Sequence, residues 1–198
     1  MQNKIFSLLL ILFSFHSFSQ NYNYIDSKAK NYSNILNTVS LSNKINNDFN
    51  TDDEKVRALF VWLVENIEYY SDKEPWTDIS LEFYFSEYQK KRDAKKKINI
   101  KILNAIKNKK ANCYDFSLIF KETCNLLNIE SHVIIGYSKG NLIDIGKNDI
   151  IKNHTWNSVK INNQWQLIDI TWAKGFHLIE KKTSNDYYYF KNPNEFIN

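Results

Sequence analysis

Two strand-like runs joined by a pair of asparagines constrain the fold of this chain most. The runs are Thr155–Ile161 and Gln164–Thr171, and Asn162-Asn163 lies between them. Because asparagine tolerates positive φ better than most residues, the pair predicts a two-residue loop and a tight antiparallel hairpin. The length of this loop fixes which residues face each other across the two strands.

This register places a histidine and an aspartate on one face of the hairpin. Pairing outward from the loop sets Trp156 opposite Asp169 and His154 opposite Thr171. Since side chains alternate along a strand, His154 and Asp169 become diagonal neighbours, and we expect their face to look at the N-terminal end of the helix that carries Cys113. The opposite face would carry Val159, Ile161, Ile168 and Ile170. A carboxylate next to an imidazole can orient it for catalysis, but a purely structural pair has the same spacing.

The rest of the chain predicts long helices before the hairpin. Thr51-Asp52-Asp53-Glu54 is a capping box that opens an amphipathic helix. The predicted elements are helices over 52–68, 81–97 and 112–127 and a strand over 133–137, closed by Gly136 and Gly140. Helices followed by paired strands make the fold α+β.

Charge gives less information about function than the motifs do. The formal charge of +4 is a mild imbalance, and no nucleic-acid-binding motif accompanies it, so a nucleic-acid partner is not expected. A basic run, Lys90 to Lys97, ends the second predicted helix. Its simplest interpretation is a solvated helix face, and binding of an acidic partner is the alternative.

The two cysteines are predicted to lie on one helix and to remain free. Eleven residues separate Cys113 from Cys124, or roughly 16 Å along a helix, whereas a disulfide needs Cα atoms within about 7 Å. Cys113 lies at the helix start, where backbone N–H groups and the dipole favour a thiolate. Cys124 lies on the apolar stripe and is expected to be core.

Other candidate sites are less well supported by the residues. Cys113, Cys124, His132 and His154 lack the close-spaced ligand pairs of zinc motifs, so no metal is expected. A serine triad lacks its Gly-x-Ser-x-Gly motif. His132 and His177 are expected to be structural or at the surface.

The N-terminus has the order of a secretory signal peptide. Lys4 precedes an apolar run over 5–15, and Ser17-Phe18-Ser19 provides small residues before Gln20. The alternative, a membrane anchor, needs about 20 apolar residues, which this run lacks. We therefore expect a signal peptide over 1–19, a loosely packed lead-in over 20–50 with a strand or short helix around Ile35 to Leu41, and one domain over 51–198. The mature chain would be periplasmic or secreted, without stable membrane insertion.

Five segments, in this order, resemble the transglutaminase-like superfamily and its kyphoscoliosis-peptidase-like branch. They begin at Asp53-Glu54-Lys55-Val56-Arg57-Ala58, Asn112-Cys113-Tyr114-Asp115-Phe116-Ser117, Gly136-Tyr137-Ser138-Lys139-Gly140, His154-Thr155-Trp156-Asn157-Ser158-Val159 and Trp165-Gln166-Leu167-Ile168-Asp169-Ile170-Thr171-Trp172. A sixth segment, from Tyr189-Phe190 to Phe196, is similar to the segment that comes after the Asp strand in that branch. The resemblance covers about residues 52–198.

The resemblance implies a papain-like α+β fold, with a nucleophile helix packed on an antiparallel sheet, and a catalytic triad of Cys113, His154 and Asp169. It further implies acyl transfer or hydrolysis at amide bonds of a protein or peptide substrate, without a cofactor. The backbone N–H of Cys113 is expected to contribute to an oxyanion hole. Trp76 is a weak candidate for a second donor, and a packing role is the favoured interpretation of this residue. Two positions depart from the family pattern, because Ala111 and Asp115 stand where glycines are usual.

An alternative function is a transglutaminase-like scaffold that binds proteins or envelope components without turnover. The presence of all three triad residues favours the enzyme. The substrate, the choice between hydrolysis and transamidation, and the oligomeric state are left open by the sequence.

Overall fold

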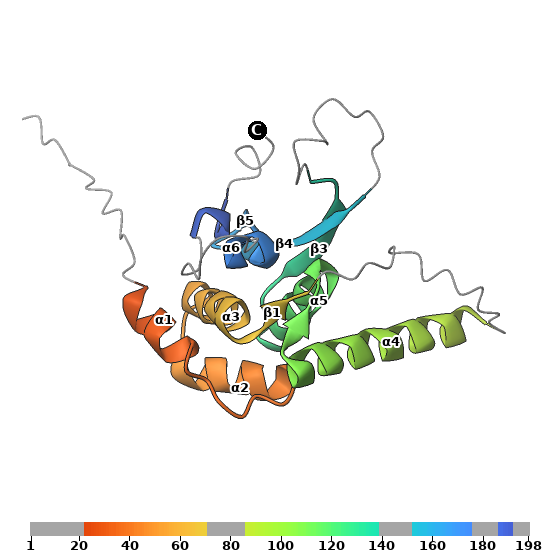
Figure 1. Cartoon of the computed structure of the whole chain (residues 1–198), viewed down its shortest axis with the longest axis horizontal. Helices are drawn as coiled ribbons and strands as arrows, with labels where there is room; N and C mark the ends of the chain where they lie inside the picture. The colour runs from red at the N-terminus through yellow and green to blue at the C-terminus, as the bar shows by residue number, and fades with distance from the viewer. Residues whose placement is uncertain (1–21, 71–85, 139–151, 176–185, 192–198) are drawn as a thin grey trace, which may run out of the picture.

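The computed structural model describes residues 22–70, 86–138, 152–175 and 186–191, and they form an α+β fold (Figure 1). The elements are α1 (Asn23–Ala29), α2 (Thr38–Asp48), α3 (Asp52–Asn66), β1 (Glu68–Tyr69), α4 (Glu87–Asn108), β2 (Lys110–Ala111), α5 (Cys113–Leu126), β3 (Ser131–Gly136), β4 (His154–Ile161), β5 (Gln164–Ile168), α6 (Ile170–Lys174) and the 3₁₀ turn η2 (Asp186–Tyr188). None of the helices within these ranges is both long enough and apolar enough to cross a membrane.

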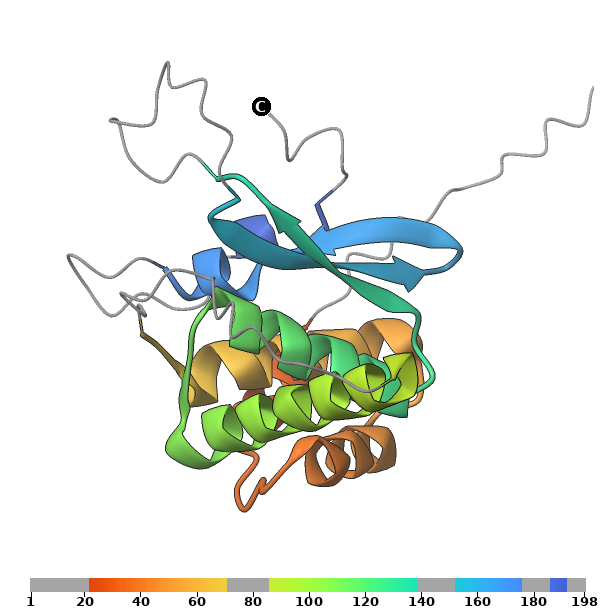
Figure 2. The same cartoon turned by 90° about the vertical axis from the view of Figure 1, so that its right-hand side faces the viewer.

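The hairpin register is confirmed, and it builds an antiparallel sheet in the order β3-β4-β5. Ile161 pairs with Gln164 and Asn157 pairs with Ile168, as a two-residue loop requires. Both loop residues have positive φ, Asn162 at 50° and Asn163 at 62°. Figure 2 shows this sheet as one layer above a layer of helices, with α5 beneath it.

The opposite faces of β4 differ in what they contact. Asn157 donates to the backbone carbonyl of Ser117 in α5 at 3.1 Å, and Val159 of the same face is completely buried. The side chains of 155, 157, 159 and 161 therefore face the helix layer. The sheet packs on the helix layer through this face, whereas His154, on the other face at the start of β4, meets the N-terminal end of α5 at Cys113, where our prediction placed it.

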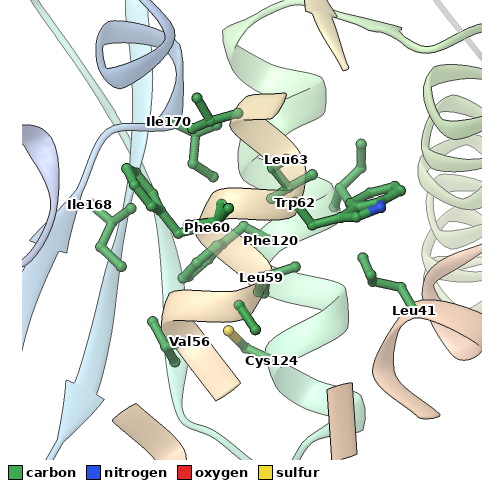
Figure 3. Packing of buried hydrophobic residues seen from close by; sticks show 14 of the residues in the cluster. Leu41, Val56, Leu59, Phe60, Trp62, Leu63, Phe120, Cys124, Ile168 and Ile170 are labelled. Carbon is green, nitrogen blue, oxygen red and sulfur yellow. The ribbon is translucent and has the colours of Figure 1, made fainter. Parts of the chain in front are cut away.

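Helix α3 is buried on all sides, because it packs against α1, α2, α5 and α6. Every residue from Val56 to Val64 is buried. In Figure 3, Leu59, Phe60 and Leu63 of α3 pack toward Phe120 of α5, with Ile168 on the sheet side. The predicted capping box is present, with Glu54 N–H donating to Thr51 Oγ1 at 3.3 Å and Thr51 N–H donating to Glu54 at 3.0 Å.

The segment before α3 is well packed, so the expectation of a loose lead-in is wrong. It forms two helices, α1 and α2, which bury Ile25, Ala29, Leu41 and Ile45 in the main core. A capping box between Asn37 and Ser40 opens α2. The strand or short helix expected around Ile35 to Leu41 overlaps the start of α2, whereas the polar composition gave no sign of α1.

Arg57, only 2% exposed, ties both ends of the described chain to α3. Its Nε donates to Asp26 of α1 at 2.7 Å, and its Nη1 donates to Asp186 of η2 at 2.8 Å. The guanidinium also lies over three aromatic rings, those of Tyr22, Phe60 and Tyr189. Burial disfavours the charged form, but the two carboxylates outweigh burial and raise the pKa of Arg57.

Helix α4 differs most from its predicted boundaries. It begins at Glu87, after the N-cap Ser86, and continues to Asn108, eleven residues beyond the expected end at Lys97. Residues 81–85 of the predicted helix and Gly140 lie outside the described residues. Ile102, Ala105 and Ile106 near the C-terminal end seat α4 against the core.

Replacing Arg57 with alanine should lower the free energy of unfolding by about 3 kcal/mol, because two carboxylates and three ring faces lose their shared cation. Urea denaturation of the full chain measures this. Arg92→Ala, which removes an exposed arginine of α4, serves as the control and should change the free energy by less than about 0.5 kcal/mol. Equal effects of the two substitutions would contradict the role given to Arg57.

Candidate active site

Cys113 is the first residue of α5, and a capping box fixes this helix end. Asn112 Oδ1 accepts from the Asp115 N–H at 2.9 Å, while Asp115 Oδ2 lies 3.4 Å from the Asn112 N–H. The thiol therefore lies in the first turn, at the positive end of the helix dipole. Asp115, which departs from the family pattern, serves here as the N3 residue of the cap.

Asp169 is the N-cap of α6, not a strand residue as the hairpin pattern predicted. The strand ends at Ile168, and Asp169 Oδ1 accepts from the Trp172 N–H at 2.9 Å. The Asp169 N–H donates to the carbonyl of Tyr188 at 3.0 Å. Aspartate is disfavoured in strands and favoured at N-caps, so the same residue type that argued for a partner also signals the helix start.

The expected contact between His154 and Asp169 is present. His154 Nε2 lies 2.6 Å from Asp169 Oδ2, and both residues are buried, at 6% and 2% exposure. One carboxylate oxygen therefore caps α6 while the other holds the imidazole. With Nε2 engaged by the carboxylate, Nδ1 is the ring nitrogen left for Cys113.

His154 and Thr155 both act to lower the pKa of the Cys113 thiol. Thr155 belongs to the face of β4 that looks at α5, whereas His154 is the first residue of the strand. The two neighbours thus approach the helix end from adjacent positions of one strand. The structure brings Cys113, His154 and Asp169 together, in that order of contact.

Charge at the site favours a thiolate facing an imidazolium. Burial alone would raise the pKa of Cys113, but hydrogen bonding with His154 and Thr155 and the charge of His154 lower it below that of an ordinary thiol. Burial would lower the pKa of His154, yet hydrogen bonds with Asp169 and Cys113 raise it to about 9. At neutral pH the imidazole is therefore charged, and it stabilises the thiolate.

Two indoles enclose the imidazole. Trp156 stacks on His154 with ring centroids 5.8 Å apart, and Trp172 meets it edge-on at 5.9 Å. Gly136 allows the first of these contacts, because a Cβ at that position would lie 2.3 Å from the Trp156 ring. The glycine that closes β3 thus leaves room for the indole that packs on His154.

Sequence reasoning missed three residues that shape this site. Thr155 helps to lower the pKa of the Cys113 thiol, Trp172 packs on His154 and its N–H donates to Asp169, and the Tyr188 carbonyl accepts from the Asp169 backbone. The spacing of Asp169 and Trp172, an N-cap and its N3 residue, was the one local signal that could have found Trp172.

The remaining candidates fall elsewhere. Cys124 is fully buried in the core, as expected, and burial raises its pKa to about 12. Both cysteines are free. His132 is at the surface, as expected, while Trp76 and His177 lie outside the described residues. Within the described ranges no cluster of His, Cys, Asp and Glu could hold a metal ion.

Comparison with known proteins places this arrangement in a family. The model of the transglutaminase-like superfamily matches residues 39–170. The chain is 30% identical to human kyphoscoliosis peptidase and 29% identical to the mouse protein, over 154 residues in each case. Those matches cover 74% of this chain but only 20% of each relative, so the chain spans about a fifth of their length.

Two further similarities are more limited. Cytokinesis protein 3 of Schizosaccharomyces pombe is 34% identical over 87 residues, covering 42% of this chain and 10% of that protein. A crystal structure of a TGase covers 84% of this chain and 40% of its own, with a TM-score of 0.42 and 17% identity.

Native alkylation should distinguish the two thiols. Iodoacetamide at pH 6 should label Cys113, whereas Cys124 should react only after unfolding. In His154→Ala the Cys113 thiol stays buried but loses its cationic partner, so its pKa rises and the labelling rate falls at least about tenfold, the effect of one pKa unit on the thiolate fraction. Mass spectrometry of tryptic peptides measures both rates.

His132→Ala is the matched control, because it removes a surface histidine and should leave the Cys113 rate unchanged. Equal, slow labelling of Cys113 in the unmodified protein and in His154→Ala would contradict the thiolate–imidazolium pair.

Proposed function

This chain belongs to the transglutaminase-like superfamily, and we propose that it is a cysteine enzyme performing acyl transfer or hydrolysis at amide bonds of protein or peptide substrates. The observation that carries the proposal is the Cys113–His154–Asp169 chain of contacts, with a pKa of Cys113 below that of an ordinary thiol. A structural thiol alone would not need a charged imidazole held by a buried carboxylate.

In the first half of the reaction, the Cys113 thiolate attacks the carbonyl carbon of a substrate amide. A C–S bond forms, and the carbonyl π electrons move onto oxygen. The backbone N–H of Cys113, at the start of α5, donates to this oxyanion. The imidazolium of His154 then gives its Nδ1 proton to the amide nitrogen, the C–N bond breaks, and a thioester and a free amine result.

In the second half, neutral His154 accepts a proton from water or from an amine as that nucleophile attacks the thioester. The C–S bond breaks and regenerates the thiolate–imidazolium pair. Water gives a carboxylic acid, and an amine gives a new amide. No cofactor enters either half, because protein side chains supply every group that reacts.

Asp169 acts through His154. Its carboxylate keeps a proton on Nε2, so that Nδ1 faces the thiol, and it stabilises the imidazolium. The same carboxylate caps α6, and its backbone N–H is held by Tyr188, so it has little freedom to turn away. This fixed position supports its role as the orienting member of a triad.

The acceptor decides between two related activities. The name of the human and mouse relatives describes them as peptidases, which favours water as the acceptor and hydrolysis as the reaction. We also propose that the protein acts in the periplasm or outside the cell, after removal of residues 1–19. The support for this location is the order of charged, apolar and small residues at the N-terminus.

A peptide library incubated with the protein should yield cleaved, deamidated or cross-linked products, read by mass spectrometry. Cys113→Ser should abolish them. Asp169→Asn should lower kcat by about 10³-fold or more, since the imidazole would lose its correct tautomer and its counter-charge. His132→Ala should retain full activity. The proposed enzymatic function would be overturned if Cys113→Ser formed the same products, or if no peptide gave any product. A binding scaffold would then be the better interpretation.

A further inference from the structure

Helix α4 concentrates the positive charge of the chain. It contains eight basic and two acidic residues, a net charge of +6, while the whole chain carries +4. The chain outside α4 then holds 18 basic and 20 acidic residues and is net negative. The positive charge therefore belongs to one element and does not describe the surface in general.

This concentration works against the helix itself. The basic residues Lys90, Lys91 and Arg92 lie near the positive end of the helix dipole, where cations are unfavourable. Like charges also stand four residues apart, in the pairs Lys91–Lys95, Arg92–Lys96 and Lys97–Lys101. A stretch that opposes its own local structure in this way is expected where function requires it.

The helix's own acidic residues are already engaged. Lys90 lies 3.9 Å from Glu87, and Arg92 lies 3.1 Å from Asp93. All eight basic residues are exposed, and within the helix the first buried residue is Ile102. Figure 1 shows the N-terminal half of α4 extending away from α3 and α5.

One side of α4 leads into a cavity of about 310 Å³. Lys101 lines this cavity, and Lys97 and Lys90 lie four and eleven residues before it, on the same side of the helix. We call Lys90, Lys97 and Lys101 the lysine track. The other residues lining the cavity are Tyr70, Asn104, Ala105, Asn108, Lys110 and Asp115.

The cavity and the thiol flank the same end of α5. Asp115 lines the cavity and lies two residues after Cys113, which places the two side chains on opposite sides of the first helical turn. A helix is about 10 Å across, so about three residues of extended chain would pass from the cavity to the thiol. A polypeptide on α4 could therefore present an amide to Cys113.

We propose that the lysine track and its cavity bind an acidic segment of the polypeptide substrate, an inference that rests on the proposed function. Lys90 and Lys101 are separated by roughly 16 Å along the helix, the length of about five extended residues. The preferred substrate thus carries a run of about five residues rich in Asp or Glu. About three residues separate this run from the amide that reacts.

The lining of the cavity favours a polypeptide over an anionic membrane. Lys101 and Lys110 offer ammonium groups to carboxylates, and the amides of Asn104 and Asn108 can both donate and accept, as a peptide backbone requires. A site for a lipid surface would instead present apolar residues around the cations. The lysine track also ends beside Cys113, which we propose acts on amide bonds, and a polypeptide contains such bonds whereas a lipid surface does not.

The test measures binding in Cys113→Ser protein, so it does not depend on turnover. The probe is a fluorescein-labelled peptide with about five glutamates, and the comparison peptide carries glutamines at those positions. Lys90→Gln/Lys97→Gln/Lys101→Gln should weaken binding of the acidic probe by about tenfold in fluorescence anisotropy at low salt. The control, Arg92→Gln/Lys96→Gln/Lys107→Gln, changes the net charge by the same amount on another side of α4, and should stay within about twofold.

Each outcome decides the proposal. Selective loss in the track variant, with weak binding of the glutamine peptide, supports it. An equal loss of probe affinity in the track variant and the control variant would show general attraction by charge, and would overturn the proposal of a defined site. The proposal would also be overturned if the acidic probe did not bind protein with an unmodified lysine track. It would be overturned likewise if vesicles containing phosphatidylserine bound more tightly than the probe and this binding depended on the track. Because an inactive enzyme can still bind the probe, failure of the proposed function gives a different result.

Discussion

The hydrogen bond between Asp169 and His154 is the interaction on which the site depends. Asp169 joins three parts of the fold, because its carboxylate caps α6 and holds the first residue of β4, and its N–H reaches Tyr188 of η2. The imidazole so held raises the acidity of Cys113 at the start of α5. A single buried carboxylate thus fixes the strand, the helix and the charge of the thiol.

A second buried charge, Arg57, connects the termini of the described chain to this site. It pairs with Asp186 at the start of η2, and η2 supplies the carbonyl of Tyr188 that accepts from Asp169. Its other partner, Asp26, belongs to α1. The N-terminal helices are therefore part of the framework that holds Asp169, and the family match beginning at residue 39 includes most of α2.

Local patterns in the sequence predicted much of this framework. The Asn162-Asn163 loop fixed the register and hence the neighbourhood of His154 and Asp169, and the capping box at Thr51 marked the start of α3. The strand pattern was extended through Asp169 although an aspartate is also an N-cap signal, and the hydrogen bond from Asp169 to Tyr188 of η2, which no local pattern contains, supports the helix start. Helix α1 and the full length of α2 escaped for a similar reason, since tertiary burial of a few side chains stabilises them.

Titration of the His154 ring by NMR tests the central claim most directly, because the claim requires one imidazole to be charged at neutral pH beside a thiol of lowered pKa. The pKa of His154 should be about 9 in the unmodified protein. It should be lower in Cys113→Ser, where the thiolate no longer favours the charged ring. A pKa of His154 near the ordinary histidine value of about 6.5 in both proteins would contradict the account.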